Sequence, residues 1–225
     1  MHIVFCGYRD WALNIIDEIK EHSLIESYEI IKSKDEFEKK IPKLTKDVDF
    51  ILLLGWSWII SDEITEKYKC IGIHPSDLPN YRGGSPLQHQ IIEGIINSKI
   101  SLISISKKLD GGDIWMKEDF SLKGDNIKTV FKNLEKSSIQ LLNNFFDSKG
   151  KVEKHQQNLD LGSYYKRRTP DKSKLHQKDL SNKSLEEIYN FIRSLTDPYP
   201  NAYIEDSEGN RLYFKEVHYE KNKHS

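Results

Sequence analysis

The feature that most constrains the fold of this chain is a continuous apolar run at residues 48–54, of the kind found in parallel strands that are buried on both faces. Near the start, a short apolar run at residues 2–6 is followed by an amphipathic stretch, residues 11–19, with apolar side chains at helical spacing. Short strands that alternate with amphipathic helices predict βαβ units. We therefore expect an α/β fold with a doubly wound, mostly parallel sheet.

The rest of the chain divides into two parts by composition. Further strands are predicted at residues 28–31, 69–73 and 100–106, and helices at residues 87–96 and 125–146. Beyond Gly150 the segment is polar and rich in lysine as far as Lys183. We expect a Rossmann-like domain over residues 1–150 and a C-terminal extension over residues 151–225.

The C-terminal extension carries the pattern of a helix and a β-hairpin. Ser184, with Glu187 three residues later, forms a capping box at the start of a helical stretch, residues 184–195. Residues 202–204 and 211–217 flank a turn and predict two antiparallel strands. A lone hairpin is marginally stable in water, so it should pack on the first domain or on a second copy of the chain. We predict a homodimer through this hairpin.

Charge and cysteine usage narrow the class of function. The chain has 34 Lys+Arg and 35 Asp+Glu, which offers no broad basic face, so we expect no nucleic-acid partner. Cys6 and Cys70 lie in separate apolar stretches, which is typical of reduced, buried thiols and favours a cytoplasmic location. The first residues lack a signal-peptide pattern, and the longest apolar run is far below the roughly 20 residues that span a bilayer. The 8 histidines show no metal-ligand spacing, so neither a membrane nor a metal is expected.

The sharpest motif leaves a predicted strand and enters a long polar loop. His74 opens the run His-Pro-Ser-Asp-Leu-Pro-Asn-Tyr-Arg-Gly-Gly-Ser-Pro, which ends at Pro86 before a predicted helix. Ligands of open α/β sheets bind in loops at the ends of strands. A single histidine at a strand end is more often structural. Here Gly83 and Gly84 permit a close backbone approach, and the combination favours a functional histidine.

A second motif places a carboxylate in a glycine-rich turn. Asp110 lies in the run Leu-Asp-Gly-Gly-Asp-Ile after another predicted strand. Taken alone, this pattern is typical of an ordinary turn, because Asp and Gly are common there. Paired with His74 it has a catalytic interpretation, since a carboxylate beside an imidazole fixes the tautomer of the ring and favours its protonated form.

Together, the patterns His-Pro-Ser-x-Leu-Pro-x-Tyr-Arg-Gly and Leu-Asp-x-Gly-x-Ile resemble those of the folate-dependent formyltransferases, over most of the chain. That family includes the methionyl-tRNA, glycinamide ribonucleotide and nucleotide-linked sugar formyltransferases. The resemblance implies the formyltransferase fold for a catalytic domain at residues 1–150, 10-formyltetrahydrofolate as the formyl donor, and a catalytic Asn, His and Asp. His74 and Asp110 match the family histidine and aspartate, whereas Gly72 stands where the family has its asparagine.

In the mechanism that the resemblance implies, an amine attacks the formyl carbon and negative charge develops on the formyl oxygen. One well-placed hydrogen-bond donor lowers such a barrier by about 3–4 kcal/mol. Gly72 offers no side chain, so His74, a backbone N–H or a residue from elsewhere is expected to stabilise this charge. Asp110 is expected to hold His74 and to assist loss of the amine proton.

The resemblance also implies which residues meet the two substrates. A flat pterin needs apolar walls, which the loop after the central strand would supply. The candidates for the folate pocket are Trp56, Ser57, Trp58, Ile59, Ile60 and Asp113. The candidates for binding the acceptor are Tyr81, Arg82, Gly83, Gly84, Ser85, Tyr164, Arg167, Arg168, Arg193 and Tyr199. The guanidinium groups among them fit phosphate oxygens, and the tyrosine rings can stack on a base.

The acceptor is inferred from the second half of the chain. Segments downstream of residue 160 resemble the sugar and methionyl-tRNA enzymes more than the glycinamide ribonucleotide enzymes. Because the methionyl-tRNA enzymes carry a further C-terminal domain and this sequence ends at Ser225, we expect a nucleotide-linked amino sugar, specifically dTDP-4-amino-4,6-dideoxyglucose for surface polysaccharide (O-antigen) synthesis. The alternatives are a methionyl-tRNA formyltransferase-like enzyme, a purine-pathway enzyme, and a non-catalytic nucleotide-sugar binder, which Gly72 favours.

Overall fold

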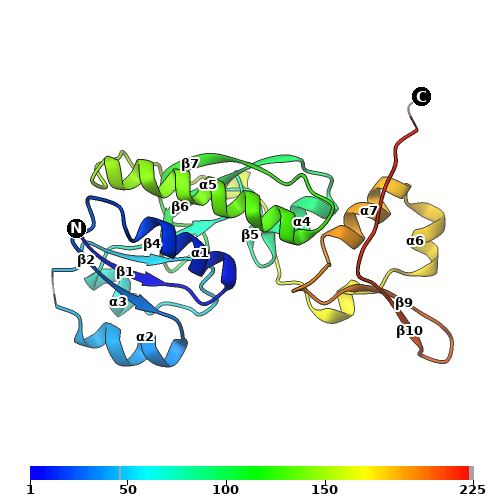
Figure 1. Ribbon diagram of the computed structural model, residues 1–225, viewed down its shortest axis with the longest axis horizontal. Helices are drawn as coiled ribbons and strands as arrows, with labels where there is room; N and C mark the ends of the chain where they lie inside the picture. The colour runs from blue at the N-terminus through cyan, green and yellow to red at the C-terminus, as the bar shows by residue number, and fades with distance from the viewer. Residues whose placement is uncertain (46, 223–225) are drawn as a thin grey trace.

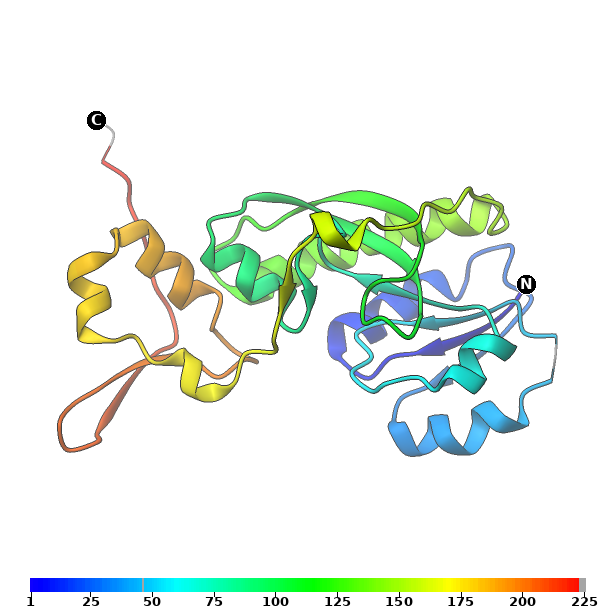
Figure 2. The same cartoon turned by 180° about the vertical axis from the view of Figure 1, so that it is seen from behind.

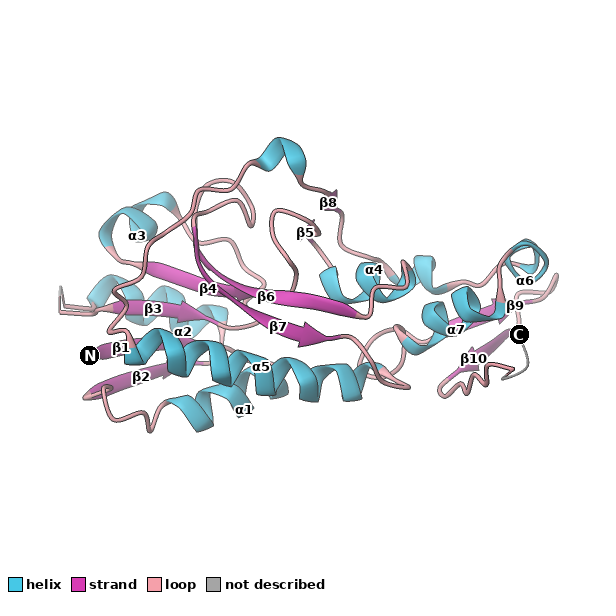
Figure 3. Ribbon diagram, turned by 90° about the horizontal axis from the view of Figure 1, so that it is seen from above, coloured by secondary structure: helices cyan, strands magenta, loops and turns pink. Residues whose placement is uncertain are grey.

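The structure, a computed structural model, describes residues 1–45 and 47–222. Its main element is a six-stranded sheet with the order β2-β1-β3-β4-β6-β7 (Figures 1 and 3). The strands are β1 (His2–Cys6), β2 (Ser27–Ile31), β3 (Phe50–Leu53), β4 (Cys70–His74), β6 (Asn97–Ser104) and β7 (Ile114–Ser121). The strands from β2 to β4 pair in parallel, so the predicted α/β fold with a mostly parallel sheet is confirmed.

The sheet departs from the parallel pattern at one edge. β6 pairs antiparallel with β4, and β7, which the sequence analysis did not predict, pairs antiparallel with β6. β7 is an edge strand, and its middle carries Lys117, Glu118 and Asp119. Charges of this kind are tolerated on an edge strand and discourage pairing with other chains. Because these charged residues interrupt the apolar run that predicts a buried strand, β7 was not predicted from the sequence.

Helices cover both faces of the sheet, as a doubly wound fold requires (Figures 1 and 2). The helices of the described residues are α1 (Asp10–Ile19), α2 (Lys34–Lys40), α3 (Asp62–Lys67), α4 (Pro86–Ile92) and α5 (Ile127–Asp147), with α6 (Gln177–Asn182) and α7 (Leu185–Arg193) set apart from the sheet in the C-terminal extension (Figure 1). α1 and α5 pack on the face to which Ile3 and Phe5 point, and α2 and α3 pack on the face to which Val4 and Cys6 point. Successive side chains of a strand point to opposite faces of the sheet, so these apolar strands contribute to a core on each side.

The C-terminal extension contains the predicted helix and hairpin. At the start of α7, Ser184 Oγ accepts from the Glu187 N–H, and the Glu187 carboxylate accepts from the Ser184 N–H, which is the predicted capping box. The hairpin consists of β9 (Ala202–Glu205) and β10 (Arg211–Phe214). Phe214 packs against an apolar cluster that includes Ile192 of α7, so one side of the hairpin is covered within the chain. Figure 2 shows the connecting segment, in yellow, running from the sheet to this extension.

The homodimer stays a prediction, and the exposed apolar side chains of β10 provide its test. Leu212 is 61% exposed and Tyr213 is 50% exposed. If two hairpins pair, Leu212→Glu is expected to convert a dimer to a monomer, because it places a charge in an apolar contact. Size-exclusion chromatography with light scattering would show the mass halved. A parent protein that is already monomeric, or a variant of unchanged mass, would contradict the prediction.

Both cysteines are buried and free, as predicted. Burial raises the pKa of the Cys70 thiol to about 12 and also raises the pKa of Cys6 well above its ordinary value. The reactive thiolate form of each is therefore scarce near neutral pH. Among the residues that the structure describes, no helix is long and apolar enough to cross a membrane, and no cluster of three or more His, Cys, Asp or Glu side chains could hold a metal ion.

Candidate active site

Three loops meet at the carboxyl edge of the parallel strands, where ligands of open α/β sheets bind. They follow β1, β3 and β4. The first carries Tyr8 and Arg9, the second begins the aromatic segment at Trp56, and the third starts at His74. The Tyr8 hydroxyl donates to Ser57 Oγ over 2.8 Å, which joins the first two loops. The predicted folate-pocket residues of the loop after β3 and the predicted catalytic histidine therefore lie at the same edge of the sheet.

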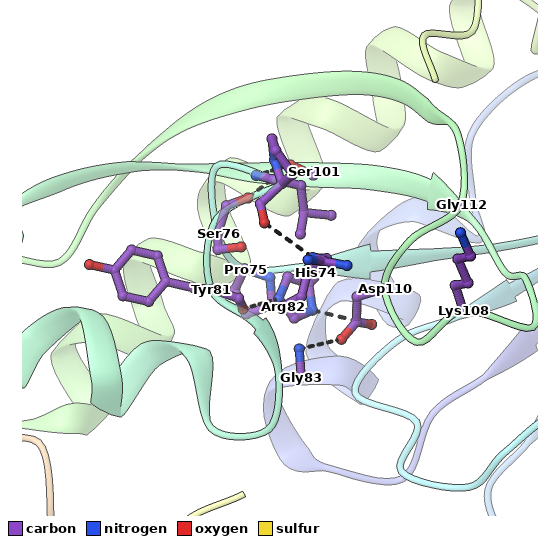
Figure 4. A network of polar contacts seen from close by, with 12 residues as sticks. His74, Pro75, Ser76, Tyr81, Arg82, Gly83, Ser101, Lys108, Asp110 and Gly112 are labelled. Atoms are coloured by element: carbon purple, nitrogen blue, oxygen red, sulfur yellow. Dashed lines mark hydrogen bonds and ion pairs between the residues drawn. The ribbon is translucent and has the colours of Figure 1, made fainter. Parts of the chain in front are cut away.

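His74 and Asp110 lie next to each other, as Figure 4 shows. The His74 Nδ1 atom is 3.5 Å from Asp110 Oδ1, and the two side chains are 8% and 19% exposed. The other ring nitrogen, Nε2, lies 2.8 Å from the backbone oxygen of Tyr81. Because a carbonyl can only accept, Nε2 carries a proton and donates it, and Nδ1 is the nitrogen left to take up a further proton beside the carboxylate.

The turn that holds Asp110 is fixed from two sides. Asp110 Oδ2 accepts from the Gly83 N–H over 2.8 Å. Gln157 Nε2 donates to the backbone oxygens of Asp110 and Gly112, over 2.9 and 2.7 Å. A Cβ at Gly112 would lie 1.9 Å from the Ser104 oxygen, so the turn admits only glycine there. Sequence reasoning missed Gln157, because it lies in the polar segment after residue 150, where no pattern distinguishes one side chain from the next.

Tyr81 and Arg82, two predicted acceptor-binding residues, stabilise the loop after His74 through contacts with other parts of the chain. Tyr81 stacks on Tyr165 with ring centroids 5.3 Å apart, and both hydroxyls donate to Glu93, over 2.6 and 2.7 Å. Burial, and then the Glu93 carboxylate, raises the pKa of Tyr81, which keeps its hydroxyl protonated as a donor. Arg82 donates to two backbone oxygens. These side chains are engaged in shaping the loop, and neither Glu93 nor Tyr165 was singled out from the sequence.

Segments far apart in the sequence close over this loop through a second, two-stranded sheet. It consists of β5 (Arg82–Gly83) and β8 (Tyr164–Tyr165), which run parallel. A Cβ at Gly84 would lie 2.4 Å from the Arg167 Cα, and Ser85 Oγ accepts from the Arg168 N–H over 3.1 Å. The predicted acceptor residues of the loop are thus brought together with those of residues 164–168. Tyr164 itself is 56% exposed.

Gly72 lies two residues before His74 on β4, so a side chain there would point to the same face of the sheet. An ideal Cβ at Gly72 would lie 3.1 Å from Ile105 Cδ1 and 3.1 Å from the Leu53 oxygen. The apolar Ile105 side chain therefore occupies the space beside the position of the family asparagine. A hydrogen-bond donor that stabilises negative charge on a formyl oxygen must therefore come from a residue other than Gly72.

The loop after β3 forms an aromatic cluster. The Trp56 ring lies 4.8 Å from Trp58 and 5.2 Å from Phe37, and Tyr8 lies 4.7 Å from Trp58, measured between centroids. Trp56 Nε1 is buried and has no hydrogen-bond partner within the described residues. Ile59 is 95% exposed and stands outside the cluster. The two tryptophans are therefore the members of this loop that provide a ring surface.

Arg193 has a structural role, contrary to the expectation that it would meet a phosphate. It is 5% exposed, and its guanidinium donates to Asn190 Oδ1 and to the backbone oxygens of Leu122 and Gly124. These bonds tie α7 to the segment before α5. A charged side chain at a helix end is usually solvated, so the sequence did not reveal that this one is buried against carbonyl groups more than 60 residues away.

The remaining candidates lie in the core or beside it. Ile60 packs against the apolar cluster under α2 and α3. Asp113 accepts from the Ser104 N–H through its backbone oxygen. Tyr199 packs against Phe131, with ring centroids 5.9 Å apart. Whether Asp113 and Tyr199 meet a ligand stays a prediction.

Comparison with known sequences identifies the family. A family model described as formyl transferase matches residues 13–144. The methionyl-tRNA formyltransferase of Sulfurihydrogenibium sp. (strain YO3AOP1) is 33% identical over 180 residues, which cover 78% of this chain and 56% of that protein. The chain therefore belongs to the formyl transferase family. It spans about half the length of the curated relatives that it matches.

Solved structures share the fold. The methionyl-tRNA formyltransferase from Clostridium thermocellum matches with a TM-score of 0.85 at 31% identity, over 98% of this chain and 94% of that chain. A 4-N formyltransferase from Francisella tularensis matches with a TM-score of 0.78 at 19% identity, over 98% of each chain. HypX from Aquifex aeolicus, in complex with tetrahydrofolic acid, matches with a TM-score of 0.70 at 20% identity, over 90% of this chain and 35% of that chain. The last two establish the fold alone.

These matches confirm the resemblance to the family and the formyltransferase fold. They do not support the expected ranking of sugar enzymes above methionyl-tRNA enzymes. The relatives that reach 30–33% identity over most of the chain are named as methionyl-tRNA formyltransferases, whereas the sugar N-formyltransferases match at 16–19%.

Proposed function

We propose that the chain is a folate-dependent N-formyltransferase, which moves a formyl group from 10-formyltetrahydrofolate to a primary amine. The observation that carries this proposal is the His74–Asp110 pair at the carboxyl edge of the sheet. It occurs in a chain whose residues 13–144 match the formyl transferase family. An imidazole beside a carboxylate is suited to remove the proton that an amine loses as it becomes an amide.

His74 Nδ1 is the proposed base. The hydrogen bond from Nε2 to the Tyr81 oxygen holds the ring, so Nδ1, which lies beside Asp110, is the nitrogen that takes the amine proton. The Asp110 carboxylate, itself fixed by the Gly83 N–H, stabilises the imidazolium that results. Because both side chains are largely buried, water and salt screen this attraction less than they would at the surface.

The aromatic loop fits the formyl donor. Trp56 and Trp58 present ring surface at the same sheet edge as His74, and a flat pterin needs apolar walls. Trp56 Nε1 is a buried donor that lacks a partner within the described residues, and a pterin carries acceptors that it can meet. HypX, which shares this fold, is solved with tetrahydrofolic acid. When bound, 10-formyltetrahydrofolate would supply the formyl group and leave as tetrahydrofolate, and Trp56 and Trp58 would hold its ring system.

Gly72→Asn is expected to destabilise the protein by about 1–3 kcal/mol, because the added side chain meets Ile105 Cδ1 and the Leu53 oxygen in a packed region. The double variant Gly72→Asn/Ile105→Val removes the Cδ1 atom and is expected to recover most of the loss. Thermal unfolding of the two variants, with Ile105→Val as the control, checks this. An unchanged Tm in Gly72→Asn would show that Ile105 does not occupy the place of the family asparagine.

Two acceptor amines are proposed, and methionyl-tRNA comes first. Relatives at 30–33% identity carry that name, including the solved enzyme from Clostridium thermocellum. A nucleotide-linked amino sugar, dTDP-4-amino-4,6-dideoxyglucose, comes second. The net charge of −1 favours it, because a protein that contacts many tRNA phosphates needs an excess of basic side chains.

Transfer assays with each acceptor in turn test the proposal and separate the two amines. The protein is incubated with 10-formyltetrahydrofolate and either methionyl-tRNA or the dTDP-linked sugar, and the product is detected by mass spectrometry. Formylated methionyl-tRNA, with binding that weakens steeply as salt rises, would support the first acceptor. A formylated sugar would support the second. If neither these amines nor the ribonucleotide amine of the purine pathway is formylated, the proposal is wrong and the non-catalytic binder remains.

A further inference from the structure

The segment of residues 155–163 contacts both loops that carry the proposed catalytic pair. It lies outside the part of the chain that matches the family model. The segment begins beside β7, where His155 and Ile114 exchange two backbone hydrogen bonds of 2.9 Å each. It ends at β8, which pairs with β5 in the loop after His74 (Figure 3). The segment therefore runs from the turn that holds Asp110 to the loop that follows His74.

Gln157 makes the contact at the Asp110 turn. It is 8% exposed, and its Nε2 group donates to the backbone oxygens of Asp110 and Gly112 over 2.9 and 2.7 Å. Its Oε1 atom has no hydrogen-bond partner within the described residues. Because an unpaired buried oxygen is unfavourable, the amide is there for the two bonds that it donates. These bonds hold the backbone from which the Asp110 carboxylate projects.

Ser163 makes the contact at the loop after His74. Its Oγ atom accepts from the Tyr81 N–H over 2.8 Å, and its backbone oxygen accepts from the Arg82 N–H over 3.0 Å. Arg82 Nη2 also donates to the backbone oxygen of Leu159, over 3.0 Å. The Tyr81 oxygen in turn accepts from His74 Nε2. Ser163 therefore fixes the residue whose carbonyl group orients the imidazole ring.

The two contacts act on one pair of side chains. Gly83 pairs with Tyr165 of β8, and the Gly83 N–H donates to Asp110 Oδ2 over 2.8 Å. Asp110 is thus held at its backbone by Gln157 and at its carboxylate by Gly83. The result is the distance of 3.5 Å between His74 Nδ1 and Asp110 Oδ1. Catalytic groups lose rate when their geometry is displaced by about 1 Å, so this distance has to be maintained.

We propose that Gln157 and Ser163 are positioning residues for formyl transfer. Gln157 directs the Asp110 carboxylate toward His74, and Ser163 orients the imidazole through the Tyr81 oxygen. A general base works only within hydrogen-bond reach of the proton that it removes, so a change in either orientation slows the reaction. This inference rests on the proposed function, and it makes the start of the C-terminal extension a part of the active site.

Gln157→Met keeps the length of the side chain and removes its donor. The variant is expected to lower kcat about tenfold and to leave the KM for 10-formyltetrahydrofolate unchanged, because the displaced group acts on the reaction and the donor binds elsewhere. Asn133→Leu is the matched control. Asn133, on α5, also donates its amide to two backbone oxygens, those of Ser121 and Lys123 at the far end of β7. It should lose stability and still transfer at the parent rate.

The proposal is wrong if kcat is unchanged in Gln157→Met, or if it falls equally in Asn133→Leu. Ser163→Ala tests the other end of the segment even if Gln157→Met folds poorly. It removes the acceptor of the Tyr81 N–H and is expected to lower kcat about threefold to tenfold, the range for one lost hydrogen bond. An unchanged kcat in Ser163→Ala would overturn the role of that residue.

A comparison in the Asp110→Asn background separates positioning from a general loss of stability. Without the carboxylate there is no charge left to direct, so Gln157→Met should cost little further rate when it is added to Asp110→Asn. Residues that act as a unit are not additive in their effects on kcat. If the two losses multiply instead, Gln157 does not act through Asp110 and the inference fails.

Amide hydrogen exchange, followed by NMR, tests the segment without any formyl transfer. The Gly83 N–H is bound to the Asp110 carboxylate, so a loosened turn should release it. Its exchange is expected to be about tenfold faster in Gln157→Met and unchanged in Asn133→Leu. Equal exchange in the parent and in Gln157→Met would overturn the inference. Faster exchange in a protein that formylates no amine would contradict the proposed function and support the link between Gln157 and Asp110.

Discussion

His74→Ala is expected to lower kcat for formyl transfer by about 10²–10⁴-fold, the usual contribution of a positioned general base. The structure supports this size of effect because Nδ1 is the ring nitrogen that faces Asp110, while Nε2 is held by the Tyr81 oxygen. The loss is measured under single-turnover conditions with saturating 10-formyltetrahydrofolate. Affinity for the donor should change little, since the aromatic loop is separate from the ring of His74.

Two controls separate a catalytic role of His74 from a structural one. Imidazole added to His74→Ala is expected to restore part of the rate, because it can enter the vacated space and accept a proton. His218→Ala, at an exposed histidine outside the sheet, should transfer at the parent rate. A His74→Ala variant that keeps the parent rate, or loses rate only in proportion to lost folded protein, would contradict the assignment.

Asp110→Asn is expected to lower kcat by about 10- to 100-fold, the range for a lost hydrogen-bonding partner of a charged group. The backbone of Asp110 is left-handed, with φ 51°, a conformation that Asn also tolerates. The amide oxygen of Asn can still accept from the Gly83 N–H, so the turn is kept and the negative charge beside His74 is removed. Steady-state kinetics and thermal unfolding are compared in the same preparation.

The alanine variant at this position provides the contrast. Asp110→Ala should lose as much rate and also lower the Tm, because alanine is strained at positive φ and leaves the Gly83 N–H without its acceptor. Full activity in Asp110→Asn would show that the carboxylate charge plays no part in the reaction. Equal losses of Tm in both variants would show that the turn, rather than the charge, had been disturbed.

The strands of the parallel core were predictable because they are buried on both faces. Strand β3 is apolar throughout, β1 and β4 are apolar except for one histidine each, and helix α1 shows apolar side chains at helical spacing. The edge strand β7 does not, because one face is solvated and carries charges such as Lys117. The position of β7 at the edge of the sheet therefore depends on its pairing with β6, which the local sequence pattern does not show.

In the candidate site too, some residues could be predicted from the sequence and others could not. His74 and Asp110 could be predicted because each lies in a distinctive motif, and the structure brings the two together. Gln157 could not, because its role is to bridge two backbone oxygens of a turn more than 40 residues away. Arg193 was misassigned for a related reason. Its charge predicted a ligand, whereas its burial and its carbonyl partners come from packing between segments distant in the sequence.

The measurement that tests the central claim most directly is a double-mutant cycle on the transfer rate, with the parent, His74→Ala, Asp110→Asn and the double variant. If Asp110 acts through His74, the double variant should be no slower than His74→Ala alone, because residues that work as one unit are not additive. Losses that multiply would mean that the two side chains act independently, and a parent that forms no formylated amine at all would contradict the account.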